Sequence, residues 1–405
     1  MSDGAAPDPA AYAIDGVTPD RAWRPGSGEE VAELLASAAA AGQVVAPQGG
    51  RSALAVGRPL DRYDVALDLS GLDRTIAYEP DDLTVTIEAG TSLRTLQSML
   101  AEYGQYLPID PPPDGRVSIG GLLATARPGA WRGQLPAARD LLLGATVAMP
   151  SGELVRSGGR VVKNVSGYDL HRLHTGALGV FGVIVEASFK LATLPPGTRS
   201  LAVPRERLED ASALALALRE LALPLRALSV LPPRAAALAG LEERPHVLVE
   251  AMGDEVTLDR SSAAIVECAG DTAGEPPDGA WERLRALAGA DQGVVLRLGV
   301  PASELAATIE AIEAAEWDGG GIVAWGHLTA GSVIAAGSAL EASEVAALRA
   351  HAEQRGGFLQ IEAGPPELRA GVDPFGEGER SLVRALRRQF DPGRTINRGR
   401  WEAES

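Results

Sequence analysis

Hydrophobic and polar positions follow two different patterns along the chain, and the change between them falls near Pro195. Before that point, short stretches with an apolar residue at every second position predict strands, as in 64–69 and 84–88. Apolar residues spaced three and four apart predict a helix over 29–41, with Ser27 as its N-cap. The order lacks the regular strand–helix alternation of a doubly wound sheet, so an α+β fold with mixed strand pairing is expected.

After Pro195 one order of elements occurs twice between residues 196 and 378. Each copy is a β-α-β-β-α unit, and the two copies share no sequence identity, so the repeat is one of topology only. Two such units, a ferredoxin-like repeat, would combine their strands in one antiparallel sheet with the helices on one face. The predicted strands are 201–204, 227–231, 246–251, 293–300, 322–327, 332–336 and 357–363, and the predicted helices are 208–221, 258–268, 303–314 and 343–354.

The chain is long enough for two domains. Its 405 residues exceed the size of one ordinary compact core. Apolar residues make up 45% and aromatic residues only 4%, which indicates a soluble globular protein with aliphatic cores. The expected division is an N-terminal lead over 1–23, a first domain over 24–195 with subdomains of about 24–90 and 91–195, a second domain over 196–378, and a C-terminal helix and tail over 379–405.

Charge and cysteine content exclude several classes of function. A net charge of −17 disfavours nucleic-acid binding, which requires a basic surface. The single cysteine, Cys268, cannot form an internal disulfide or hold a metal or an iron–sulfur cluster alone, as suits a reducing cytoplasm. Since no stretch of about 18 apolar residues and no signal-peptide pattern occurs, we expect a cytoplasmic protein without direct membrane insertion.

The first candidate site is a short glycine loop after the predicted strand 43–46. Two glycines let the backbone approach a ligand and turn its N–H groups toward an anion, and neighbouring polar side chains could add donors. This suits a pyrophosphate, although a plain glycine turn with exposed polar residues is the alternative. Neither the Rossmann fingerprint nor the P-loop pattern is present. The candidate cofactor-binding residues here are Pro47, Gln48, Gly49, Gly50, Arg51 and Ser52.

The second candidate site joins a rigid proline stretch to a short glycine-bearing helix. Prolines over 108–113 fix an extended backbone. A helix capped by Ser118 would then present free N–H groups and its positive dipole end to a diphosphate. The alternative is a buried glycine-rich helix start without a ligand. The candidate residues are Pro111, Ser118, Ile119, Gly120, Gly121 and Thr125.

Three later segments add weaker signals. Arg139-Asp140 precedes the strand 143–149, and the string 157–170 ends in Gly-Tyr-Asp-Leu. Tyr168 either supplies a donor near a cofactor or fills the edge of a core, while Asp169 is interpreted as a helix cap. Three glycines over 176–182 suggest a backbone packed against something flat, or a tight passage from helix to strand. The candidate residues are Asp140, Tyr168, Gly182, Val183 and Ile184.

The order and spacing of these segments resemble the FAD-binding domain of the vanillyl-alcohol oxidase and p-cresol methylhydroxylase superfamily. That family has a glycine loop, a proline stretch, an S-I-G-G-x-x-A-T segment, R-D before a strand, and G-Y-D-L with a closing G-x-x-G-V-I, in this order. All are present here over roughly 170 residues, a typical domain size. Within the superfamily the chain most resembles the FAD-binding E subunit of glycolate oxidase, through the string 157–170, the tail from Asp391 to Asn397 and a similar length.

The resemblance implies how the cofactor is held. It assigns the pyrophosphate to Gln48–Ser52, and it assigns a second phosphate and the ribityl chain to Ser118–Gly121 and Thr125. It assigns the pyrimidine edge of the isoalloxazine to the backbone of Gly182–Ile184. The first loop has no histidine where relatives form a covalent bond to the flavin, so the FAD is expected to be noncovalent.

One departure from the family concerns metal. Superfamily members that oxidise 2-hydroxy acids with a divalent metal carry paired histidines and a following Glu-His in the second domain. Here only His327, in Gly326-His327-Leu328-Thr329-Ala330-Gly331, is similar to that loop, and the second histidine is missing. A metal site needs several converging ligands, so none is expected. His327 is interpreted as a hydrogen-bonded histidine at a strand end, and a structural role is also favoured for His171 and His174.

The resemblance implies an oxidoreductase, and no residue is singled out as catalytic. The first hypothesis is a flavoprotein subunit of a glycolate oxidase complex that converts glycolate to glyoxylate. Its partners would be a paralogous FAD- and metal-bearing subunit and an iron–sulfur subunit, which could hold it at the inner face of the membrane. The second is a self-sufficient FAD-dependent oxidase or dehydrogenase for an alcohol or 2-hydroxy acid. The third is an assembly subunit that has lost the flavin.

Overall fold

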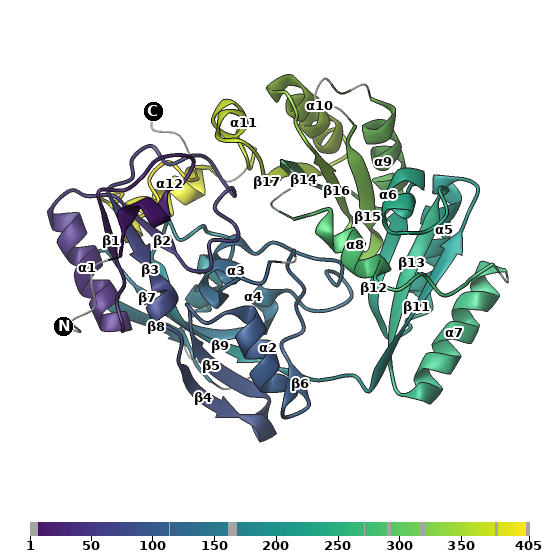
Figure 1. Ribbon diagram of the computed structural model, residues 1–405, viewed down its shortest axis with the longest axis horizontal. Helices are drawn as coiled ribbons and strands as arrows, with labels where there is room; N and C mark the ends of the chain where they lie inside the picture. The colour runs from purple at the N-terminus through teal and green to yellow at the C-terminus, as the bar shows by residue number, and fades with distance from the viewer. Residues whose placement is uncertain are drawn as a thin grey trace.

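The computed structural model describes residues 7–112, 114–160, 168–270, 272–289, 293–315, 317, 321–376 and 380–401. Helices and mostly antiparallel strands form two lobes side by side, as Figure 1 shows, so the predicted α+β fold class is confirmed. We call the part from β1 to β10, together with α12 and the tail, the first lobe. The part from β11 to α11 is the cap. No helix among the described residues has the length and apolarity needed to cross a membrane.

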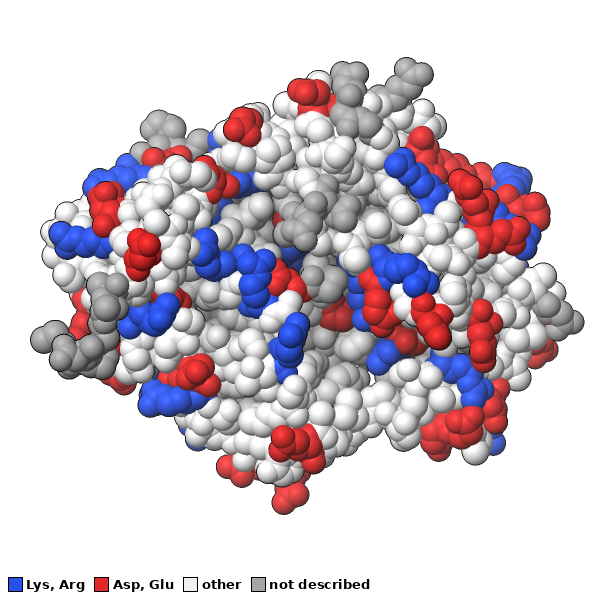
Figure 2. Space-filling view, viewed as in Figure 1, with Lys and Arg blue, Asp and Glu red and all other residues white. Residues whose placement is uncertain are grey.

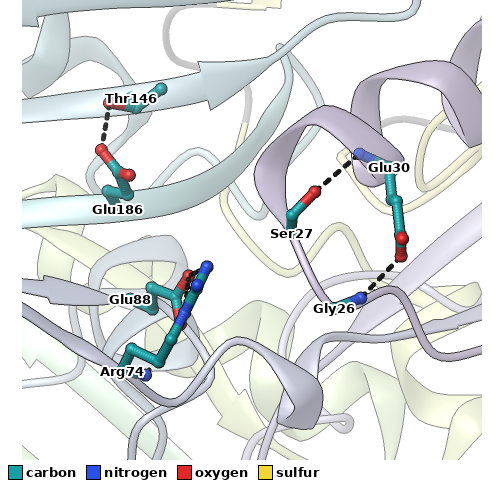
Figure 3. Close-up of polar contacts among 7 residues, drawn as sticks. All are labelled: Gly26, Ser27, Glu30, Arg74, Glu88, Thr146 and Glu186. Atoms are coloured by element: carbon teal, nitrogen blue, oxygen red, sulfur yellow. Dashed lines mark hydrogen bonds and ion pairs between the residues drawn. The ribbon is translucent and has the colours of Figure 1, made fainter. Parts of the chain in front are cut away.

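A small parallel sheet opens the first lobe, in the strand order β1-β3-β2. Helix α1 packs on it through Val31 and Leu35, which are fully buried. The predicted cap of this helix is confirmed, because the Ser27 hydroxyl accepts a hydrogen bond from the Glu30 N–H at 3.2 Å (Figure 3). The elements are β1 (Arg21–Trp23), α1 (Gly28–Ala40), β2 (Val45–Gln48) and β3 (Val65–Asp68).

A five-stranded antiparallel sheet, in the order β4-β5-β9-β7-β8, forms the centre of the first lobe. One face packs against α2 and α3 through aliphatic and aromatic side chains such as Ile87, Leu96 and Phe189. Helix α1 covers part of the other face. The elements are β4 (Thr75–Glu79), β5 (Thr84–Glu88), α2 (Leu93–Ala101), β6 (Gln105–Tyr106), α3 (Ile119–Thr125), α4 (Ala138–Leu141), β7 (Leu142–Ala148), β8 (Leu154–Gly158), β9 (Val183–Lys190) and β10 (Ala192–Thr193).

The part of this sheet that α1 leaves uncovered is polar. Glu88 accepts hydrogen bonds from Arg74, the shortest at 2.7 Å, and Glu186 accepts one from the Thr146 hydroxyl at 2.8 Å (Figure 3). Thr146 and Glu186 also line a hollow of about 290 Å³ on this face. These groups are paired with one another, so the polar face is stabilised by its own hydrogen bonds.

The cap is built on one seven-stranded antiparallel sheet, in the order β11-β13-β12-β15-β16-β14-β17. Helices α5, α7, α9 and α10 cover one face, as predicted for a ferredoxin-like repeat (Figure 1). The other face packs against α6, α8 and the segment around Trp131 of the first lobe. The elements are β11 (Gly197–Pro204), α5 (Leu208–Glu220), β12 (Leu225–Leu231), α6 (Pro233–Leu238), β13 (His246–Gly253), α7 (Glu255–Ala269), α8 (Ala280–Ala286), β14 (Val294–Gly299), α9 (Leu305–Ala314), β15 (Val323–His327), β16 (Ser332–Gly337), α10 (Ala342–Glu353), β17 (Phe358–Ala363) and α11 (Pro366–Gly371).

After the cap, helix α12 (Arg380–Phe390) and the tail return to the first lobe (Figure 1). The tail pairs in parallel with β2 through Val45 and Ile396. Asp391 is fully buried and accepts the N–H groups of Thr395 and Ile396 at 2.9 and 2.8 Å. Arg400 is buried near the end of the tail and donates to the Arg58 carbonyl at 3.1 Å.

Candidate functional site

The glycine loop begins at the end of β2 and folds against the start of α3. A Cβ at Gly49 would lie 2.2 Å from the Ser118 hydroxyl oxygen, and one at Gly50 would lie 1.3 Å from the Arg116 carbonyl oxygen. Only glycine fits at either position. The main-chain N–H groups of residues 49–52 find no acceptor within the described chain. Arg51 has a left-handed backbone, with φ +59°, so the loop is a turn whose N–H groups can bind an anion.

Two polar side chains of this loop, Gln48 and Arg51, bond to other parts of the chain. The Gln48 amide donates to the Tyr12 carbonyl at 3.1 Å and to the Tyr63 hydroxyl. The Arg51 guanidinium donates to the carbonyls of Ala11 and Ala13. The expectation that the Arg51 side chain adds a donor for the phosphate is therefore wrong, because the N-terminal segment already occupies it. Any contribution of these two residues to an anion site comes from the main chain.

At the start of α3 the predicted cap is confirmed, since the Ser118 hydroxyl accepts the Gly121 N–H at 3.2 Å. The expected free N–H groups are absent from this helix start. The Ile119 N–H donates to the Thr91 carbonyl at 2.9 Å, and the Gly120 N–H donates to the Ala89 carbonyl at 2.7 Å. The prediction failed because the chain leaving β5 runs alongside this turn and accepts its hydrogen bonds. Among the described residues, the N–H groups of the glycine loop, residues 49–52, lack an acceptor.

The glycine loop, α3 and the start of β9 surround a narrow hollow of about 80 Å³. Glycine is frequent in its wall, and Gly182 has φ +150° with no room for a Cβ beside Val147. The tail completes the wall through Asn397, whose amide donates to the Leu178 carbonyl at 2.7 Å. The hollow is lined by Pro47, Gly49, Leu69, Ala89, Ser118, Gly120, Gly121, Ala124, Leu178, Gly179, Gly182, Val183, Ile184 and Asn397.

This hollow continues toward the cap. A second, smaller hollow shares Gly121 with the first and also contains Ser52 and Thr125. It shares Pro111 and Arg127 with a third, larger pocket. The three hollows therefore adjoin one another in a row, which we call the groove, from the glycine loop along α3 to the boundary between the lobes. An elongated ligand with a phosphate group at the loop would reach that boundary with its other end.

The third hollow, which we call the interdomain pocket, has a volume of about 280 Å³. Its wall comes from the proline stretch, the segment after α3, helix α4 and strand β14 of the cap. Arginine is the commonest charged residue there, and Figure 2 shows Lys and Arg side chains gathered near the middle of the visible face. The lining residues are Pro108, Ile109, Asp110, Pro111, Leu122, Ala126, Arg127, Pro128, Gly129, Trp131, Arg132, Pro136, Ala137, Ala138, Arg139, Asp140, Thr175 and Arg297.

A buried ion triad forms the end of this pocket. Glu362 on β17 accepts the Nε–H of Arg127 through Oε2 and the Nε–H of Arg297 through Oε1, both at 2.8 Å. The triad joins the lobes, because Arg127 follows α3 while Arg297 and Glu362 belong to the cap. Burial by itself would raise the pKa of Glu362, but the two guanidinium groups outweigh it and hold that pKa below its usual range.

Asp110 is the second buried acid of the pocket. It accepts the Trp131 N–H at 3.1 Å and lies 3.8 Å from the Arg285 guanidinium of the cap. Burial raises the pKa of Asp110 to about 7, although Arg285 and the main-chain N–H groups oppose the shift. Two cap arginines contact the Trp131 ring. The Cζ atoms of Arg226 and Arg285 lie 4.7 and 5.5 Å from the ring centroid. These contacts hold the cap against the first lobe.

The remaining predicted residues are more scattered. Asp140 lines the interdomain pocket and accepts the Ala137 N–H at 3.2 Å. Tyr168 is 90% exposed, so the interpretation that it fills a core edge was wrong. Asp169 occupies the N-cap position of the turn 170–174, but its side chain caps no N–H. The segment 161–167, with Lys163 and Asn164, lies outside the described residues.

The histidines have structural surroundings. His327 ends β15 and bonds to the Ser229 hydroxyl at 2.8 Å, as predicted, and burial lowers its pKa to about 4. Burial also lowers the pKa of His174 to about 4, while His171 bonds to Ser157. Within the described part of the chain, no three His, Cys, Asp or Glu side chains gather in a way that could hold a metal ion.

A glycine-lined groove that leads from an anion-binding loop to a pocket under a cap is the architecture of a flavoprotein. Residues 19–158 match the family model described as FAD binding domain. This match covers the part of the chain whose motifs resemble the vanillyl-alcohol oxidase and p-cresol methylhydroxylase superfamily, and it agrees with the predicted cofactor, FAD.

Solved structures show the same fold over nearly the whole chain. A p-cresol methylhydroxylase with bound substrate superposes with a TM-score of 0.76 at 15% identity, covering 96% of this chain and 89% of the other. An alkyldihydroxyacetonephosphate synthase superposes with a TM-score of 0.71 at 17% identity, covering 95% and 77%. The cap as well as the first lobe is therefore a known arrangement.

Sequence relatives match less than half of this chain. The glycolate oxidase subunit GlcE of Escherichia coli is 38% identical over 160 residues, which is 39% of this chain and 45% of the relative. A D-2-hydroxyglutarate dehydrogenase of Xanthomonas citri pv. viticola is 34% identical over 190 residues, 47% and 38% of the two chains. The mitochondrial D-lactate dehydrogenase of Arabidopsis thaliana is 32% identical over 199 residues, 49% and 35%. The matches thus span less than half the length of these relatives.

Several residues that line the groove were not predicted from the sequence. Asn397 was noted only as part of a family motif, and Arg127, Trp131 and Arg297 were not singled out. Strong charge on an otherwise apolar strand was a usable signal for Arg297, which interrupts Val-Val-Leu-Arg-Leu in β14. Arg127 and Trp131 lie in an irregular segment, where periodicity carries no information.

Proposed function

We propose that this chain is an FAD-dependent oxidoreductase that acts on a small 2-hydroxy acid. The observation that carries the proposal is the continuous groove from the glycine loop to the arginine-lined interdomain pocket. A dinucleotide lying along it would have its diphosphate at the loop and its ring at the boundary between the lobes. The names of the sequence relatives, which include D-2-hydroxyglutarate dehydrogenase, D-lactate dehydrogenase and a glycolate oxidase subunit, support this substrate class.

The residues present fit the cofactor. The N–H groups of residues 49–52 would hold the diphosphate, while Gly121 and Thr125 would lie beside the ribityl chain. Gly182–Ile184, which the resemblance assigns to the ring, line the hollow next to the glycine loop instead, so they would lie nearer the diphosphate. We propose that the FAD is noncovalent, because the loop has no histidine and Cys268 belongs to helix α7, in the outer layer of the cap (Figure 1).

Bound FAD supplies a two-electron acceptor for a hydride from the carbon that bears the hydroxyl group. The contribution of the chain is to orient the acid and to exclude water. The arginines of the interdomain pocket would attract its carboxylate, and the cap would cover it. Asp110, with a pKa near neutrality, is the buried carboxyl group within the pocket that could take up or release a proton.

We further propose that the chain works as the FAD-binding subunit of a glycolate oxidase complex that converts glycolate to glyoxylate. The likeness to subunit GlcE supports this, as does a likeness to subunit GlcD of Bacillus subtilis at 26% identity over 195 residues, 48% of this chain and 41% of that subunit. Its partners would be a paralogous FAD- and metal-bearing subunit and an iron–sulfur subunit. The chain would lie in the cytoplasm, and these partners would hold it at the inner face of the membrane. The alternatives are a self-sufficient 2-hydroxy-acid dehydrogenase and a flavin-free assembly subunit.

Three measurements test the proposal. Purified protein should show the absorption bands of flavin, and heat or acid should release the flavin into the supernatant if it is noncovalent. Glycolate, D-lactate and D-2-hydroxyglutarate are then tried with an artificial electron acceptor, first on the isolated chain and then on material co-purified with its partners. Turnover only in the complex supports the subunit role, and turnover by the chain alone supports the self-sufficient enzyme. Absence of saturable FAD binding would refute both.

A further inference from the structure

The ion triad at the end of the interdomain pocket carries an unbalanced charge. Glu362 is 4% exposed and is shared by two guanidinium groups, so the triad has one positive charge more than it has negative charge. A buried charge without a counter-ion is costly, since the interior solvates it poorly. Of the other acids nearby, Asp114 is paired with Arg116 at 2.8 Å, and Asp110 lies 3.8 Å from Arg285. The pocket therefore favours an anionic ligand.

The free edges of the two arginines are in position to bind one. Arg127 uses Nε for Glu362 and Nη2 for the Ala288 carbonyl, and Arg297 uses Nε for Glu362 and Nη2 for Gln360. The Nη1 group of each arginine donates to no atom of the described residues. Neither Nη1 group is one of the fully buried atoms that lack a partner. Both arginines line the pocket, so these groups remain accessible to a ligand there. Guanidinium groups fixed by one carboxylate are preorganised for an oxyanion.

We propose that Arg127 and Arg297, bridged by Glu362, form a clamp for the carboxylate of the substrate. The inference rests on the proposed function for the identity of the ligand. Arg127 comes from the first lobe and Arg297 from the cap, so the clamp exists only while the lobes are docked. Glu362 is a positioning residue, because it holds both guanidinium groups and does not itself meet the ligand. The clamp selects 2-hydroxy acids over neutral alcohols.

The test uses oxalate, a small dicarboxylate with no C–H bond to oxidise, so that binding is measured without turnover. Oxalate is titrated into the FAD-loaded protein at fixed pH and salt, and its affinity is followed by calorimetry and by the change in flavin absorption. Arg297→Met should weaken oxalate binding roughly 10- to 100-fold, the effect of a lost charge-assisted hydrogen bond. Arg297→Lys should restore part of it, because the charge returns without the planar fork.

Arg199→Met is the matched control. Arg199 is also a cap arginine held by two acids, Glu255 and Asp259, but it does not line the interdomain pocket. Its loss should leave oxalate affinity unchanged, and circular dichroism of both variants shows whether they fold. Unchanged oxalate affinity in folded Arg297→Met would overturn the proposal.

Three further outcomes separate the clamp from the proposed function. A variant Arg297→Met that loses FAD affinity but keeps oxalate affinity would assign the clamp to the cofactor diphosphate and overturn the proposal. Protein that never binds FAD refutes the flavoprotein function, yet oxalate calorimetry on that apoprotein still tests the clamp. Turnover of 2-hydroxy acids with an Arg297-independent KM would refute the clamp and leave the function standing.

Discussion

Asp110 should make the folded protein less stable as the pH rises through the neutral range, and Asp110→Asn should abolish that loss. Burial raises the pKa of Asp110 to about 7 from the ordinary value of 3.8. Between these values the folded protein binds a proton that the unfolded chain has released. The contribution of Asp110 to the free energy of unfolding is therefore greatest below about pH 4 and falls as the pH rises toward 7. Asparagine keeps an oxygen that can accept the Trp131 N–H but carries no charge at any pH.

The size of the effect follows from the shift. A difference of about three pKa units corresponds to about 4 kcal/mol between the acidic and alkaline limits. About 2.7 kcal/mol of this should be lost between pH 5 and pH 8, because the lower part of the titration lies below pH 5. The buried position of Asp110 means that solvent screens little of this energy.

The assay is guanidinium chloride unfolding of the apoprotein at pH 5 and pH 8, for the wild type and the variant. Subtracting the free energy of unfolding of the variant from that of the wild type at each pH cancels the pH dependence that the two proteins share. Asp140→Asn is measured alongside, as the same substitution at an exposed acid of the same pocket. If the free energies of unfolding of wild type and Asp110→Asn differ by the same amount at both pH values, within about 0.5 kcal/mol, the reasoning is refuted.

Three other predictions concern the groove and the tail. Gly50→Ala should abolish FAD binding measured by fluorescence titration, because its Cβ would collide with the Arg116 carbonyl and displace the loop. Ser118→Ala and Ser27→Ala each remove an N-cap and should each cost about 1 kcal/mol of stability, but only Ser118→Ala should also weaken FAD binding. Asp391→Ala should destabilise the protein by about 2–4 kcal/mol in denaturant unfolding, because two buried N–H groups lose their acceptor; a smaller loss than about 1 kcal/mol would contradict this.

The order of elements could be predicted because its signals are local. Every predicted strand and helix of the cap has a counterpart in the structure, since each depends on the spacing of apolar residues within its own segment. The Ser27 and Ser118 caps were predicted for the same reason. Local chemistry also identified Gly49 and Gly50 as the place of a close backbone approach.

The directions of side chains could not be predicted, because they depend on segments far away in the sequence. Arg51 turns from the groove toward carbonyls some 40 residues earlier, and Gln48 turns toward Tyr12 and Tyr63. The interdomain pocket was invisible for the same reason. Arg127 and Glu362 are separated by 235 residues, and only the docking of the lobes brings them together.

The parallel pairing of Val45 with Ile396 makes the cap an insertion within the first lobe. Strand β2 and the tail meet at the edge of one sheet, although roughly 350 residues lie between them in the sequence. During synthesis the ribosome must release the tail before Asn397 can complete the wall of the groove. A fragment that stops after β10 would therefore lack part of the wall of the groove. If this groove holds the proposed flavin, synthesis must pass Asn397 before the cofactor site is complete.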